Sequence, residues 1–65
     1  MAMQMIGTIM SHDETRRACV MMETRASFKG PKFTVETQLE NERKSYNSYW
    51  DLFSATEAAA KFVKG

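Results

Sequence analysis

Few residues in this chain of 65 can cross-link it or break its regular structure. Cys19 is the only cysteine, so no disulfide can form within the chain, and a lone thiol suits a reducing compartment such as the cytoplasm. With one cysteine and one histidine, we expect no metal site. Three glycines and one proline leave few positions for sharp turns. The sequence therefore predicts a fold that efficient packing or self-association must stabilise.

Long apolar runs and an excess of charge are missing as well. No apolar run has the roughly 20 residues that cross a bilayer. Residues 1–7 lack the basic and apolar regions of a signal peptide. The net charge is +1, whereas dedicated nucleic-acid binders usually carry a clear basic excess. These absences favour a cytoplasmic protein that makes no membrane contact.

The chain does contain enough apolar residues for one small domain, which we expect to span residues 1–65. Hydrophobic residues make up 43% and charged residues 26%, which argues against disorder. A domain of this length builds only a modest core, and self-association is one common way to add stability. A homodimer is therefore one expectation.

The strongest local pattern predicts a helix over residues 54–63. Ser54 is a favourable N-cap residue, and Glu57, three positions later, completes a capping box. Phe53 and Ala58 occupy the two positions of a hydrophobic staple. The pattern therefore predicts that the helix begins at Ser54.

The same segment carries one apolar stripe at helical spacing. The stripe consists of Ala55, Ala58, Ala59, Phe62 and Val63. Gly65 is a natural helix stop. Because about ten residues do not form a stable helix alone, we expect this stripe to pack on a sheet.

Four segments with strand-like patterns precede the helix. They span residues 3–10, 16–28, 32–40 and 45–52. Lys29-Gly30-Pro31 and short polar stretches separate them, which favours antiparallel neighbours. The predicted fold class is α+β: a four-stranded, or three-stranded, antiparallel meander with one C-terminal helix packed on one face.

Alternation assigns the faces of two of these strands. The even positions of residues 16–28 and the odd positions of residues 32–40 are predicted to point toward the core. Met5 and Met22 are expected to help fill that core. The register of the fourth strand stays open. The two sets of inward residues that its pattern allows are Tyr46, Trp50 and Leu52, or Tyr49 and Phe53.

A single helix covers one side of such a sheet, so the other side is the candidate site. One interpretation is a solvated face with cross-strand ion pairs. The other is a docking surface with Met21, and Ile6 or Met10, as apolar anchors. The partner-binding candidates are Arg17, Met21, Arg25, Lys32, Thr34, Gln38, Arg43 and Lys44.

No group of residues specifies a reaction. His12-Asp13-Glu14 is interpreted as a polar turn, because neighbouring turn residues do not converge on one atom. Cys19 lacks a partner histidine and is interpreted as a structural or incidental thiol. Tyr46, Tyr49 and Trp50 are assigned to the core in preference to base stacking. We therefore expect no catalytic residue, no cofactor and no enzymatic activity.

The segment Trp50-Asp-Leu-Phe-Ser-Ala-Thr-Glu-Ala-Ala-Ala-Lys-Phe62 resembles a junction in the plant ethylene-response-factor DNA-binding domains and the arm-binding domains of phage integrases. In those domains a three-stranded antiparallel sheet leads into a helix through a phenylalanine and a capping residue, like Phe53 and Ser54 here. Their sheet face reads the DNA major groove with arginine and tryptophan. The resemblance implies a DNA-binding module, for which the matching strand offers Arg17 and Arg25.

The same segment is similar to small phage-encoded anti-CRISPR proteins. Some of these have a four-stranded meander followed by a helix with a pattern like Phe53…Thr56-Glu57. Such proteins bind a subunit of a nuclease complex through sheet-face residues. Our first hypothesis is accordingly a non-enzymatic, stand-alone interaction protein, such as a phage inhibitor, with a protein or ribonucleoprotein partner. The alternative is a small DNA- or RNA-binding module that uses the same face.

Overall fold

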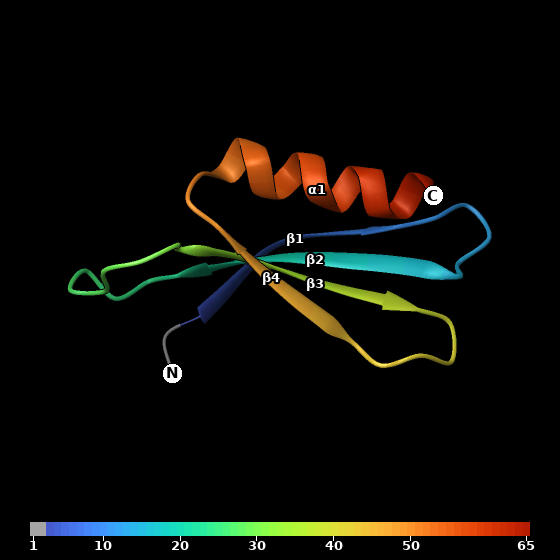
Figure 1. Cartoon of the computed structure of the whole chain (residues 1–65), viewed down its shortest axis with the longest axis horizontal. Helices are drawn as coiled ribbons and strands as arrows, with labels where there is room; N and C mark the ends of the chain where they lie inside the picture. The colour runs from blue at the N-terminus through green and yellow to red at the C-terminus, as the bar shows by residue number, and fades with distance from the viewer. Residues whose placement is uncertain (1–2) are drawn as a thin grey trace.

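The structure, a computed structural model, describes residues 3–65; Met1 and Ala2, part of the segment examined for a signal peptide, lie outside the described residues. Its elements are β1 (Met3–Met10), β2 (Arg16–Glu23), β3 (Phe33–Leu39), β4 (Ser45–Tyr49) and α1 (Leu52–Lys64). The strands form one antiparallel sheet in the order β1-β2-β3-β4, and α1 lies on one face of it (Figure 1). The predicted fold class is therefore confirmed.

The core lies between α1 and the middle of the sheet. Its buried members are small, namely Ala18, Val20, Val35, Ala55 and Ala59. Half-buried side chains surround them, namely Phe33, Tyr49, Phe62 and Val63. The inward positions predicted for Ala18, Val20, Phe33 and Val35 and most of the helix stripe are thus confirmed. Thr24 and Ala26, also predicted to point inward, are exposed and lie after the end of β2. Val35 is the largest fully buried side chain, so the core is thin.

The second strand ends at Glu23, not at Phe28 as the alternation predicts. The Glu23 carboxylate accepts the backbone N–H of Arg25 at 3.1 Å, and the Phe28 N–H donates to the Arg25 carbonyl at 3.2 Å. The guanidinium of Arg25 also lies 5.6 Å from the centre of the Phe28 ring. These local contacts curl the chain into a loop and end the strand.

The fourth strand is short, and its register matches neither predicted set completely. Tyr49 lies opposite Phe33 and packs against the core, as one alternative requires. Phe53, its predicted companion, is 73% exposed, and so is Trp50 of the other alternative. Because the strand ends at Tyr49, the aromatic residues after it belong to the turn and the first helical turn.

The helix begins at Leu52 with Asp51 as its N-cap, so the prediction that Ser54 caps it is wrong. Asp51 Oδ2 accepts the Ser54 backbone N–H at 2.8 Å, and Asp51 Oδ1 accepts the Ser54 hydroxyl at 2.9 Å. These bonds hold the pKa of Asp51 below its usual value. With Phe53 exposed, the predicted staple is absent too. The predicted stop is correct, since the Gly65 N–H donates to the carbonyls of the last turn and its φ is +91°.

The two capping schemes can be separated by substitution. Asp51→Ala removes the acceptor of two hydrogen bonds and should lower the melting temperature by about 4–8 °C. Glu57→Ala, which would break a capping box at Ser54, should leave it nearly unchanged, because Glu57 lies beyond the first turn. Thermal melts followed by circular dichroism measure both. Equal losses, or a larger loss for Glu57→Ala, would contradict an Asp51 cap.

Candidate functional site

The face of the sheet opposite α1 is open to solvent, and we call it the open face (Figure 1). Directly opposed residues of an antiparallel pair point to the same side, so the register identifies its members. They are Met3, Met5, Thr8, Met10, Arg17, Cys19, Met21, Glu23, Thr34, Glu36, Gln38, Tyr46 and Ser48. Four strands therefore contribute to one continuous surface.

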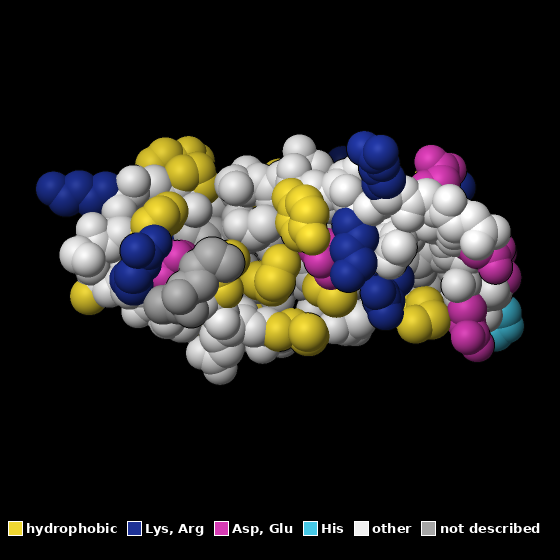
Figure 2. Space-filling model, turned by 90° about the horizontal axis from the view of Figure 1, so that it is seen from below, with side chains coloured by type: hydrophobic (Ala, Val, Ile, Leu, Met, Phe, Trp, Pro, Cys, Tyr) yellow, Lys and Arg dark blue, Asp and Glu magenta, His cyan; other side chains and the backbone are white. Residues whose placement is uncertain are grey.

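Apolar side chains run across the middle of the open face. Met5 is 60% exposed and Tyr46 58% exposed, while Met21 between them is half-buried. Met10 is exposed nearer the β1–β2 turn. Figure 2 shows hydrophobic side chains along the middle of this face, with lysines and arginines beside acidic groups on either side.

Two of these apolar residues, Met5 and Tyr46, were predicted to lie in the core, and this prediction is wrong. The register between β1 and β2 shifts between Met5 and Gly7, so one extra residue sits in β1. Met5 then lies opposite Met21 on the open face. Tyr46 lies opposite Glu36, also on this face. Gly7 was a usable signal for the bulge, because an isolated glycine inside a strand pattern often marks one, and the alternation of Tyr46 with Tyr49 was a signal for the fourth strand.

On the β4 side of the open face, the Glu36 carboxylate contacts two neighbouring side chains. Its Oε2 accepts the Tyr46 hydroxyl at 3.0 Å and lies 3.7 Å from Lys44 Nζ. The hydrogen bond to the carboxylate raises the pKa of Tyr46. Arg17 Nη2 donates to Gln38 Oε1 at 3.3 Å, so its contact is to a neutral amide. The positive charge of Arg17 is therefore not balanced by a carboxylate in these contacts.

At the other end, Arg25 is engaged with its own chain. It lies in the loop after β2, and its Nε and Nη2 donate to the two Glu23 oxygens at 3.1 and 3.2 Å. The hydrogen bonds from Arg25 lower the pKa of Glu23, whose side chain is buried beneath it. Lys32 lies just before β3 and is exposed. Arg25 is thus held in place, and its charge is neutralised.

The structure brings some of the predicted site residues together and separates others. Those that share the open face or its margin are Arg17, Met21, Thr34, Gln38 and Lys44. Arg25 and Lys32 lie at the opposite end, by the loop between β2 and β3, and Arg43 lies in the exposed turn between β3 and β4. The predicted site residues therefore do not form one patch. Five lie on or beside the open face, and the other three lie apart in the two loops.

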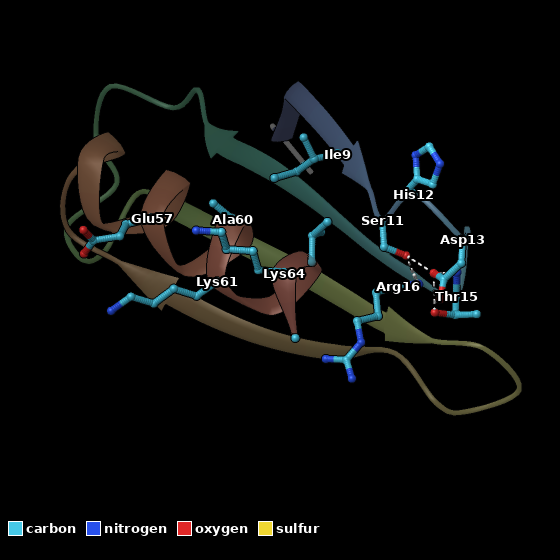
Figure 3. A pocket seen from close by; sticks show the side chains of 12 residues that line it. Ile9, Ser11, His12, Asp13, Thr15, Arg16, Glu57, Ala60, Lys61 and Lys64 are labelled. Carbon is cyan, nitrogen blue, oxygen red and sulfur yellow. Dashed lines mark hydrogen bonds between the residues drawn. The ribbon is translucent and has the colours of Figure 1, made fainter.

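Apart from the open face, a hollow lies between the β1–β2 turn and the C-terminal half of α1 (Figure 3). Asp13 organises its polar side, accepting hydrogen bonds from the hydroxyls of Ser11 and Thr15 at 2.7 and 2.8 Å. These bonds lower the pKa of Asp13 to about 2. In Figure 3 the ring of His12 points away from this network. The segment is thus a hydrogen-bonded turn.

The arginine of this hollow has a structural contact. Arg16 Nη1 donates to the Phe62 carbonyl at 3.3 Å, and its guanidinium lies 5.9 Å from the centre of the Phe62 ring. It therefore ties the last turn of α1 to the start of β2. Figure 3 shows Glu57 and Lys61 extending outward from the helix, so the charged groups share no common target.

Within residues 3–65, no three histidine, cysteine, aspartate or glutamate side chains are grouped closely enough to hold a metal ion. Cys19 is buried on the open-face side of β2, and its Sγ accepts the Thr8 hydroxyl at 3.5 Å. No helix among these described residues is long and apolar enough to cross a membrane. The open face is therefore the surface on which a function is argued below.

Comparison with known proteins adds no assignment: no protein-family model, no curated protein and no solved structure matches this chain.

Proposed function

We propose that this protein is a non-enzymatic interaction protein that binds a protein partner through its open face. The observation that supports this most is the exposure of Met5, Met10 and Tyr46 on one sheet face with Arg17 beside them. Methionine, tyrosine and arginine are enriched at protein interfaces, and grouped exposed apolar side chains mark binding surfaces. A face meant only for solvent needs none of these apolar residues.

The charges of the open face suggest the chemistry of the partner. Glu23 and Glu36 are already paired with Arg25 and Lys44. Arg17 lies next to the apolar side chains, and within the described residues it donates to the neutral amide of Gln38 and forms no ion pair. The partner surface that fits is therefore apolar with an acidic group at its margin.

A protein partner fits better than nucleic acid. The open face offers one exposed aromatic residue, Tyr46, and the cations Arg25 and Lys44 are paired with carboxylates, whereas single-strand binders combine several stacking aromatics with a basic groove. The resemblance of the β4–α1 junction to anti-CRISPR proteins makes inhibition of a nuclease complex the first specific role to test.

Charge reversal tests the proposed surface. Arg17→Glu should weaken binding of the partner roughly tenfold or more, because it puts a repulsive charge against an acidic surface. Arg17 is exposed, so the fold should not change. The partner is recovered from the encoding cells with the wild-type chain as bait, and its affinity for each variant is then measured by titration.

Lys61→Glu on the far side of the molecule serves as the matched control and should bind like the wild type. Tyr46→Ala should weaken binding as Arg17→Glu does. Unchanged affinity for both open-face variants would reject this surface. Tight binding of random duplex DNA or RNA with a steep fall in added salt would instead indicate a nucleic-acid-binding module.

A further inference from the structure

The strand β1 is a sheet edge that neither charge nor proline protects, with the bulge between Met5 and Gly7 as its one irregularity. Residues 3–10 contain no charged residue and no proline, although β1 is eight residues long and stands at the end of the sheet. Natural edge strands usually carry charges or proline, which discourage pairing with another chain. The opposite edge, β4, is five residues long and mostly polar. Of the two edges, β1 is therefore the one suited to accept another strand.

An apolar groove runs along β1 on the helix side of the sheet. It has a volume of about 330 Å³ and lies between β1 and the first half of α1. Ile6, Ile9 and Leu52 line it, and each is at least 40% exposed. A side chain added at Gly7 would meet no atom within 4 Å, so the groove is open beside this residue. A glycine in a strand interior often marks a bulge, as Gly7 does here, or a close approach by another backbone.

The surface area is consistent with a missing partner. The chain exposes 4819 Å², whereas a compact monomer of 7.5 kDa is expected to expose about 4,250 Å². The excess, about 570 Å², is close to the roughly 600 Å² that each partner contributes to the smaller stable interfaces. The thin core, with Val35 as its largest fully buried side chain, leaves the monomer in need of further burial.

We propose that the β1 edge and its groove bind a second copy of this chain, with the two β1 strands paired antiparallel. Such a contact is isologous, so each copy gives the other the same strand and the same groove. No like charges oppose each other, because β1 has no charge. Ile6, Ile9 and Leu52 of each copy cover the groove of the other. Pairing also uses up both β1 edges and stops at two copies.

The proposed dimer has a consequence for the open face. A two-fold axis perpendicular to the sheet joins the two sheets into one of eight strands, with both helices on the same side. Met5 and Met10 of both copies then lie near the centre of a doubled open face. The dimer would present two equivalent binding surfaces side by side.

Sedimentation equilibrium of the full chain tests the dimer. The wild type should have twice its 7.5 kDa chain mass. Ile9→Lys places a charge in the paired region and should raise the dissociation constant about a hundredfold. Asn47→Lys puts the same charge on β4 and should leave the dimer intact. A wild-type chain that stays monomeric at about 1 mM would overturn the proposal, because even a weak dimer would then be populated.

Gly7→Val gives a second, independent test. Its side chain has free space in the monomer and valine favours strands, so the fold should be kept, as far-UV circular dichroism can show. The added side chain fills the groove and should raise the dissociation constant about tenfold or more. A dimer that tolerates both Ile9→Lys and Gly7→Val, or one lost only in Asn47→Lys, would refute pairing through β1.

Discussion

Replacing Ala59 with leucine is expected to unfold a large share of the molecules. Ala59 is completely buried where α1 meets the sheet, next to Ala55 and Val35. Inserting larger side chains into a packed core costs about 1–3 kcal/mol. A domain of this size rarely has more than about 3–5 kcal/mol of stability from one core. We expect the melting temperature to fall by about 10 °C or more, measured by circular dichroism.

The matched control is the same substitution one residue later. Ala60 is exposed on α1, so Ala60→Leu should leave the melting temperature unchanged or slightly higher. If Ala59→Leu melts like Ala60→Leu, α1 does not approach the sheet through its alanine face. The pair therefore tests the contact that fixes which side of the sheet stays open.

This close approach of α1 explains which parts of the fold the sequence could predict. Periodicity of two identified the strands, and periodicity of 3.6 identified the helix stripe, because burial on one face imposes both patterns. Ala55 and Ala59 were expected to be buried, and they are. These elements follow from local patterns that the tertiary structure reinforces.

The same alanines explain the errors on the aromatic residues. Size suggested that Tyr46 and Trp50 belong in the core. With only alanine and valine between α1 and the sheet, the space there is too thin for several rings. Tyr49 fits at its margin, while Trp50 and Phe53 stay exposed. The thickness of the core layer is a tertiary property that no local pattern encodes.

The start of α1 and the end of β2 were predicted at the wrong residues. The side chains that decide both boundaries stand in the sequence, but the sequence alone does not show which of them forms the hydrogen bonds. Asp51 and Ser54 are both good N-cap residues, and the structure uses Asp51, with Ser54 as a donor to it. Alternation continues past Glu23 to Phe28, yet the bonds between Glu23 and Arg25 end the strand earlier. Side-chain to backbone hydrogen bonds of this kind compete with regular structure and decide its ends.

The candidate site was foreseen in part. Alternation placed Arg17, Met21 and Thr34 on the side away from the core, where the structure has them. Met5 reached the same face only because of the bulge in β1. Arg25, which was predicted to lie in the second strand, lies in the loop after β2 and is paired with Glu23. The apolar part of the open face was therefore underestimated, and its positive charge overestimated, before the structure was known.

Replacing Val35 in β3 with threonine is also expected to lower the stability of the protein strongly. Val35 is fully buried against the core, so Val35→Thr places a hydroxyl where no polar group is needed. Burying a polar group without a hydrogen bond costs about 1–3 kcal/mol, although the shape of the side chain is kept. The melting temperature should drop by about 10 °C in a circular dichroism melt.

The reverse substitution at the adjacent position is the control. Thr34 lies on the open face between Met21 and Ser48, so Thr34→Val should cost no stability and should enlarge the apolar area there. If Thr34→Val destabilised the protein as much as Val35→Thr, the two faces of β3 would not differ in burial. A stable Thr34→Val protein with altered partner affinity would instead link the open face to binding, because the substitution changes that face and leaves the core intact.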